Sequence, residues 1–291
     1  MTKKIRLSLV FIIFMIQLPI AGQGQSTDTS SSWLQQKEEQ LNAYFDTLVN
    51  STSEMKRIQI NDKILDTLRE VVKQPGSFEY SFDSIENAGI LQSEDNKLKL
   101  YNWNLPYNDG THDYYCLIQY KADDDNGIKI FELKDKSASI EEPESAILNY
   151  PEWYGALYYK IIPIKSRTNE TYYTLIAYDM NDYLTDKKIV DILRFDEENK
   201  PVFGASIFKN RREVSNRLIF EYGEFASMML KYDKEKKMIV YDHLSPSKPE
   251  YEGQREYYGP DFSYDGLKYE NGIWNTYFDL DLRLNEININ Q

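Results

Sequence analysis

The sequence predicts an α+β fold in which two N-terminal helices precede a larger, predominantly antiparallel β domain. Apolar residues recur at helical spacing up to about residue 72 and in short alternating runs after residue 77. Most of the 24 tyrosines lie in the second region, and aromatic residues favour strands. Turn signals join these runs closely, so consecutive strands should pair antiparallel. A sandwich, an open barrel and a meander all fit this pattern.

The first 24 residues have the features of a cleavable secretion signal. Three basic residues precede an almost wholly apolar run over 7–20, and small residues up to Gly24 place the cleavage near Gln25. The apolar run of about 14 residues is shorter than the roughly 20 that a membrane-spanning helix needs. We therefore expect an exported, water-soluble bacterial protein in the periplasm, at the cell surface or outside the cell, with no transmembrane segment in the mature chain.

Charge and cysteine content exclude several classes of partner. Without the three basic residues of the signal, the 34 Lys and Arg fall to 31 against 47 Asp and Glu, a formal charge of −16. This charge opposes binding to nucleic acid and to anionic membranes. The single cysteine, Cys116, can form no intrachain disulfide and lies far from the cleavage point where a lipoprotein carries its lipid. We expect no lipid anchor, and a buried, unreactive thiol at Cys116.

Residues 25–76 are predicted to form a short linker followed by two amphipathic helices. The polar stretch 25–32 is the expected linker, and the first helix is expected to begin at Ser32 with a capping box to Gln35. The second begins at 51–53, where Glu54 would complete another capping box, and ends at Pro75 and Gly76. Each helix has one apolar stripe and should pack it on the β domain. The docking side chains are expected to be Leu41, Phe45, Leu65 and Leu68.

The β domain is predicted to extend over residues 77–291. In the segment 97–105 the apolar positions change phase between Leu100 and Tyr101, which predicts a β-bulge. Asp279 and Asp281 alternate with apolar residues and should form the wet face of the last strand. The expected strands are 78–82, 97–105, 113–121, 128–133, 156–164, 172–179, 189–195, 217–222, 227–232, 237–242 and 274–284.

Four strings in the chain carry a resemblance to a protein family. They are LKLYNW from Leu98, YYKII from Tyr158, IVYDHLSP from Ile239 and YGPDFSYDG from Tyr258. Together they resemble exported proteins of the Bacteroidota that have no established function, over most of the mature chain. The resemblance implies export to the envelope and brings no catalytic residue with it.

No arrangement of residues in the sequence identifies a reaction, a metal site or a cofactor. HExxH, CxxC, GxSxG, P-loop and GxGxxG patterns are all absent. His112 lies in a predicted turn and should be a solvent-exposed loop residue. His243 should be structural, because the adjacent Asp242 would point to the opposite face of a strand. The run 123–127 offers oxygen ligands without EF-hand spacing and is predicted to be a solvated hairpin turn.

A candidate ligand site is predicted where the segment 257–266 meets the end of the strand that carries Asp242 and His243. This segment mixes aromatic and acidic residues without a regular period, so we expect an irregular loop. Such a loop either covers one end of the core or forms a binding rim. The candidate ligand-binding residues are Asp242, His243, Tyr258, Asp261, Tyr264 and Asp265.

Two classes of function remain open from the sequence. The first is a non-catalytic envelope or secreted binding protein whose partner is a glycan, a peptide or an envelope protein, since aromatic faces and carboxylates suit such ligands. The second is a carboxylate-dependent hydrolase of envelope or dietary glycans or peptides, which needs two carboxyl groups facing one cleft at about 5–10 Å. A structural role within an assembly is a third. The discriminating observation is whether Asp242, His243, Asp261 and Asp265 converge in one pocket.

Overall fold

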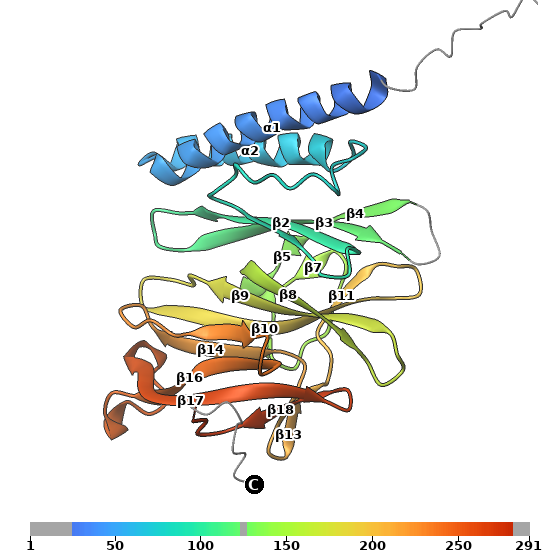
Figure 1. Cartoon of the computed structure of the whole chain (residues 1–291). Coiled ribbons are helices and arrows are strands. Elements are labelled where there is room, and N and C mark those ends of the chain that lie inside the picture. The colour runs from blue at the N-terminus through green and yellow to red at the C-terminus, as the bar shows by residue number, and fades with distance from the viewer. Residues whose placement is uncertain (1–24, 123–126, 282–291) are drawn as a thin grey trace, which may run out of the picture.

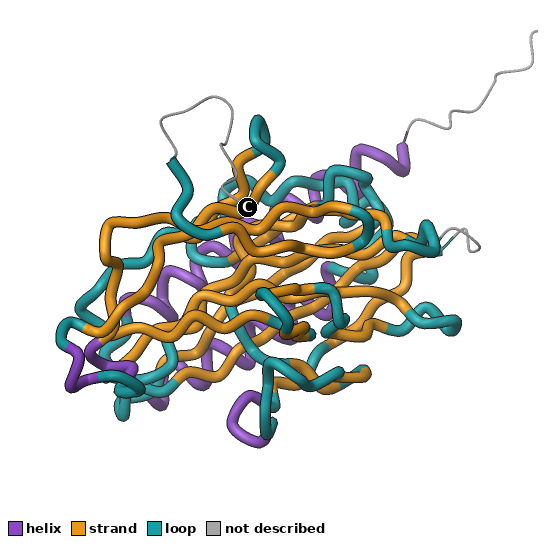
Figure 2. Tube along the Cα trace, turned by 90° about the horizontal axis from the view of Figure 1, so that it is seen from below, coloured by secondary structure: helices purple, strands orange, loops and turns teal. Residues whose placement is uncertain are grey.

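The computed structural model describes residues 25–122 and 127–281, which form four stacked layers (Figure 1). Helices α1 (Gln25–Asn50) and α2 (Glu54–Val71) are the first layer, and three sheets follow in chain order. Seen from the third sheet, the helices lie behind the strands (Figure 2). The predicted α+β class with mainly antiparallel pairing is confirmed; only the pairs β12–β18 and β5–β7 are parallel among the described strands. No helix of this part of the chain is long and apolar enough to span a bilayer.

The three sheets are assembled mainly from strands that are neighbours in the sequence. The first has the order β1 (Gly89–Gln92), β2 (Leu98–Pro106), β3 (His112–Lys121), β4 (Ile128–Glu132). The second has the order β6 (Leu148–Asn149), β11 (Pro201–Phe203), β10 (Thr185–Phe195), β9 (Thr171–Asp179), β8 (Leu157–Lys165), and β14 (Leu218–Gly223) also pairs with β10. The third has the order β13 (Glu213–Ser215), β12 (Phe208–Asn210), β18 (Ile273–Tyr277), β17 (Tyr258–Glu270), β16 (Met238–Pro246), β15 (Leu230–Asp233). The short strands β5 (Lys134–Asp135) and β7 (Glu152–Trp153) pair separately, and the 3-10 turns are η1 (Ser137–Ser139), η2 (Pro249–Tyr251) and η3 (Arg255–Tyr257).

The two helices pack on the first sheet through the predicted apolar stripe. Leu41, Phe45 and Leu68 are buried, and Leu65 is partly buried against the same cluster. The Phe45 ring meets the Trp103 ring of β2 edge-on, with 6.1 Å between centroids. Burying such a stripe stabilises helices that would be marginal on their own.

The first helix starts earlier than predicted, and the second starts where it was predicted but with a different cap. Helix α1 begins at Gln25, so the polar stretch 25–32 is helical and is not a linker. The Ser30 hydroxyl donates to the Pro75 carbonyl, a tertiary contact that local sequence rules do not include. Helix α2 is capped by Ser53, which accepts from the Lys56 amide. Glu54 completes no capping box, because its carboxylate accepts from the Asn108 amide instead.

Strand β2 is buried on both faces, which explains the change of apolar phase in its sequence. Leu98 and Leu100 belong to the cluster between the first and second sheets. Tyr101, Trp103 and Leu105 belong to the cluster under the helices. The pairing of β2 with β3 is uninterrupted along the strand, so the predicted bulge is wrong. A strand between two layers reads as a nearly continuous apolar run.

Three other segments also depart from the predictions. The segment 78–82 is a turn whose carbonyls accept from the buried Lys99 ammonium, and not a strand. The last strand ends at Tyr277, because Asp279 has a left-handed backbone (φ 54°) and its amide bonds Asp265. The segment 257–266 is largely part of β17 rather than a loop, since β16 supplies its backbone partners. The acidic run 123–126 lies outside the described residues, as does the signal segment 1–24.

Candidate functional site

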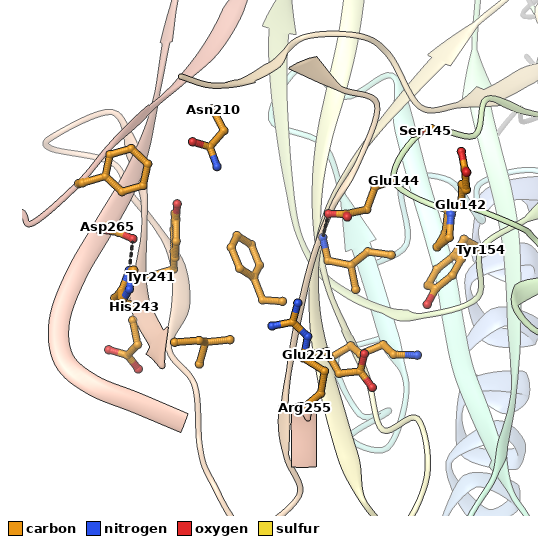
Figure 3. A pocket seen from close by; sticks show the side chains of 17 residues that line it. Glu142, Glu144, Ser145, Tyr154, Asn210, Glu221, Tyr241, His243, Arg255 and Asp265 are labelled. Carbon is orange, nitrogen blue, oxygen red and sulfur yellow. Dashed lines mark hydrogen bonds and ion pairs between the residues drawn. The ribbon is translucent and has the colours of Figure 1, made fainter. Parts of the chain in front are cut away.

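A pocket of about 640 Å³ lies between β14 of the second sheet and strands β16 and β17 of the third (Figure 3). We call it the His243 pocket. Its walls combine carboxylates, aromatic rings and two cations from segments that are far apart in the chain. The lining residues used below are Glu142, Glu144, Tyr154, Lys187, Phe220, Glu221, Tyr241, Asp242, His243, Arg255, Asp265 and Phe278.

The central polar contact of this pocket joins His243 to Asp265. The His243 Nδ1–H donates to Asp265 Oδ2 at 2.7 Å, and the Asp279 amide donates to the other carboxylate oxygen at 3.1 Å. Asp265 is buried, whereas 43% of the His243 side chain is exposed. The hydrogen bond from the imidazole raises the pKa of His243, with the nearby negative charge adding to the effect. The buried carboxylate thereby orients the ring and favours its charged form.

A β-bulge creates the position of His243. Asp242 pairs with Tyr264 and Leu244 pairs with Pro260, so His243 stands opposite the extra residues 261–263 of β17. Phe262 in this bulge has a left-handed backbone (φ 70°) and is 92% exposed. Such bulges re-aim side chains at strand edges, and here the bulge lets His243 reach Asp265 on the neighbouring strand.

Strand alternation predicted that Asp242 and His243 would not pair with each other, and they do not. Its carboxylate accepts from the Met229 amide at 2.7 Å, and its own amide donates back to the Met229 carbonyl at 3.1 Å. Asp242 therefore ties β16 to the start of β15. Both acidic groups beside His243 are thus committed to holding strands in place.

The opposite wall of the pocket is a loop, 142–145, anchored by Asn216 and Arg217. Figure 3 shows Glu142, Ser145 and Tyr154 across the pocket from His243 and Asp265, with Arg255 between the two groups. The Asn216 side chain donates to the Ser145 carbonyl, and the buried Arg217 guanidinium donates to the Pro143 carbonyl and, at 2.7 Å, to Asp191. A buried ion pair in the second sheet therefore positions this wall.

A second pocket, of about 510 Å³, adjoins the first and contains the other histidine. We call it the His112 pocket. His112 is the first residue of β3, is half-buried and lies 2.8 Å from the Asn104 side-chain amide through Nδ1. Burial lowers its pKa. The prediction of a solvent-exposed loop histidine is therefore wrong, because β2 and β3 extend to Pro106 and His112 and the ring stacks on Tyr114.

Carboxylates in the His112 pocket are held by several hydrogen bonds. Asp135 accepts from the amides of Tyr114, Ser137 and Gly155. Asp179 accepts from the Tyr114 hydroxyl at 2.8 Å, and its burial raises its pKa. These acids brace the junction of the first and second sheets.

The structure brings three of the six candidate residues together and separates the others. Asp242, His243 and Asp265 line the His243 pocket. Tyr258 lies in a neighbouring depression under the Arg255 guanidinium, 4.7 Å from its carbon to the ring centroid. Asp261 is exposed at the bulge, where hydrogen bonds from Ser263 lower its pKa. Tyr264 packs on the other face of the third sheet, in the cluster with Met238 and Val240.

Several pocket residues were not singled out from the sequence. Tyr154, Glu144, Glu221 and Arg255 come from four different segments, and no local spacing links them. The string EEPE at 141–144 is acidic, but an acidic chain has many such strings. Long-range contacts, such as that of Arg217 with Pro143 74 positions away, show which of these strings faces the pocket.

Cys116 and metal binding can also be assessed from the described residues. Cys116 is buried, and burial raises the pKa of its thiol, so its environment is that of an unreactive cysteine. Within 25–122 and 127–281, no three His, Cys, Asp or Glu side chains are grouped closely enough to hold a metal ion.

Comparison with known proteins gives no family assignment. The chain matches no protein-family model, no curated protein sequence and no solved structure.

Proposed function

We propose that this chain is an exported, non-catalytic binding protein of the bacterial envelope or its surroundings, and that its ligand occupies the His243 pocket. The pocket has the size and the mixed aromatic and polar lining of ligand sites. Export rests on the features of the first 24 residues and on the resemblance to exported proteins of the Bacteroidota.

The observation that carries the non-catalytic proposal is the commitment of both acids beside His243. Asp265 accepts from His243 and from the Asp279 amide, and Asp242 accepts from the Met229 amide. A carboxylic acid that works as a general acid or nucleophile must be free to meet the reacting bond. These two groups instead build a rigid wall, which suits recognition of a bound molecule.

One specific observation favours the alternative, a hydrolase of glycans or peptides. A buried carboxylate on Nδ1 orients a histidine so that Nε2 can act as a base, as in catalytic triads. The His243 and Asp265 pair has this arrangement, and among the described residues none bonds His243 Nε2. The only serine that lines the pocket within the described residues, Ser145, lies on the opposite wall (Figure 3).

A binding screen followed by substitution tests the proposal. The mature protein is screened against envelope glycans and peptides by a thermal-shift assay, and each hit is repeated by calorimetry with Arg255→Ala. Arg255 lines the pocket and is exposed, so its removal should change the affinity of the hit while leaving the fold intact. Arg212→Ala, at an exposed position outside that pocket, is the matched control and should bind normally.

Product analysis separates binding from hydrolysis. Each hit is incubated with wild type and with His243→Gln, and the mixture is analysed by mass spectrometry. We expect unchanged ligand in both. If wild type cleaves the ligand and His243→Gln does not, the protein is a hydrolase and the binding proposal is wrong. If Arg255→Ala leaves the affinity unchanged, the ligand does not bind in this pocket.

A further inference from the structure

We propose that the His243 pocket and the His112 pocket form one groove and that this groove binds an extended, positively charged peptide segment. This inference rests on the proposed binding function and names the chemistry of the ligand. It is carried by the residues that the two pockets share, by an unpartnered tyrosine hydroxyl and by the charge of the walls.

The two pockets meet at Tyr154 and Lys187, which line both of them. Their volumes, about 640 and 510 Å³, are each large enough for more than one amino-acid side chain. A ligand that fills both must therefore be elongated and must pass Tyr154. One edge of the second sheet lines the groove, together with residues of the first and third sheets.

Tyr154 presents its hydroxyl group at the junction of the groove. Only 5% of the residue is exposed, yet its hydroxyl makes no hydrogen bond to any residue in the described part of the chain. The hydroxyl oxygen is not one of the buried polar atoms without a partner in the described residues, so it is accessible from the groove and free to bond a ligand there. Burial and nearby carboxylates raise the pKa of Tyr154, which keeps the hydroxyl protonated and able to donate, for instance to a peptide carbonyl.

The walls of the groove are more acidic than the chain as a whole. Nine carboxylates and three cations line the two pockets when shared residues are counted once, against 47 acids and 34 bases in the whole sequence. Glu142, Glu144, Glu221 and Asp242 form no ion pair with any described residue. The Lys187 ammonium, by contrast, donates to Asn181 and lies 3.9 Å from Asp179. Unpaired negative charge along the groove favours a ligand that carries positive charge.

The aromatic walls agree with this chemistry. Phe220, Tyr241 and Phe278 line the pocket beside the carboxylates. A guanidinium or ammonium group is attracted both to a carboxylate and to the face of an aromatic ring. The same walls repel acidic glycans. Arginine and lysine side chains on a peptide backbone therefore match the groove better than neutral or acidic sugars do.

Calorimetry with three probes, two matched charge variants and the variant Tyr154→Phe tests the inference. The probes are a short peptide of alternating arginine and glycine, its glutamate counterpart and a neutral cello-oligosaccharide. The groove variant is Glu142→Gln, Glu144→Gln and Glu221→Gln together, which removes charge but keeps the carbonyl oxygens that bond Ile219 and Thr185. The control variant, Glu39→Gln, Glu197→Gln and Glu235→Gln, removes the same charge at exposed sites outside the groove.

We expect only the arginine peptide to bind, about tenfold or more weakly to the groove variant, and with nearly unchanged affinity to the control. Tyr154→Phe should weaken binding about fivefold by removing one hydrogen bond. If both charge variants lose the same affinity for the arginine peptide, the peptide is attracted to the acidic protein as a whole, and the inference is overturned. Binding of the oligosaccharide that Tyr154→Phe weakens would overturn the peptide assignment while leaving the binding function intact. If no probe binds the groove, the inference fails, and the wider screen above then decides the proposed function on its own.

Discussion

His243 on β16 donates through Nδ1 to Asp265 on β17 at 2.7 Å, across a bulge that places three residues of one strand against one of the other. The contact fixes β16 against β17 and holds one wall of the His243 pocket in place. Because it involves a titratable ring and a buried carboxylate, it links stability to pH.

The first prediction concerns this pH dependence. The folded-state pKa of His243 lies above its ordinary value of 6.5. The stabilisation is therefore complete below the ordinary value and is lost as the pH rises through the folded-state value. Urea unfolding of wild type and of His243→Gln gives the difference in their free energies of unfolding. We expect wild type to be the more stable by a larger margin at about pH 5 than at about pH 8. A difference that stays constant across this range would show that the pair adds nothing through its charge.

The second prediction concerns Lys99, whose ammonium is buried beneath the helices. It donates to the carbonyls of Ser77, Phe78 and Tyr80, and burial lowers its pKa from 10.5 to about 8. Between these values the unfolded chain binds more protons, so this group makes stability rise with pH. We expect the stability of wild type relative to Lys99→Met to increase by about 1–3 kcal/mol from pH 8 to 10. Chemical denaturation at a series of pH values measures it, and a decrease would contradict the burial argument.

The third prediction concerns the ion pair of Arg217 with Asp191, which are 0% and 2% exposed at their side chains. Arg217→Met leaves a buried carboxylate without its partner and frees the loop 142–145, so we expect a loss of about 3–5 kcal/mol. Adding Asp191→Leu should restore part of this loss, because it removes the uncompensated charge. Thermal and urea unfolding of the two variants compares them, and a double variant less stable than the single one would argue against charge burial as the cause.

The fourth prediction concerns export. Mass spectrometry of the protein isolated from its native cells should find a mature N-terminus near Gln25. The same preparation should contain no lipid modification. Intact Met1 on most molecules would rule out cleavage of the signal.

The class of the fold was predictable because its causes are local. Helical and alternating periods can be read from consecutive residues. Both helices were therefore predicted, and the second helix and most strands were placed within a few residues. The stacking of layers was not predictable, since burial of β2 on both faces depends on the second sheet, whose strands follow much later in the chain. The apparent phase change at Tyr101 was therefore taken for a bulge, whereas a real bulge near His243 was taken for a loop.

The candidate site was predictable only in part, for the same reason. The sequence pointed to His243 and Asp265 because a rare histidine and a dense acidic and aromatic segment stood out. The far wall was missed, because Tyr154 and Glu144 reach the pocket through contacts of the buried Arg217 and of neighbouring layers. Tyr264 was included although strand alternation turns it away from Asp265.

The most direct test of the central claim is a titration followed by NMR of the mature protein labelled in its tyrosine rings. The arginine and glycine peptide is added stepwise, and the ring signals of Tyr154 and Tyr241 report on the groove. Tyr44, on helix α1, lies in a different layer and serves as the internal reference. The account predicts saturable shifts of Tyr154 and Tyr241 while Tyr44 stays fixed. Unmoved groove signals, or shifts of Tyr44 as large as those of Tyr154, would contradict it.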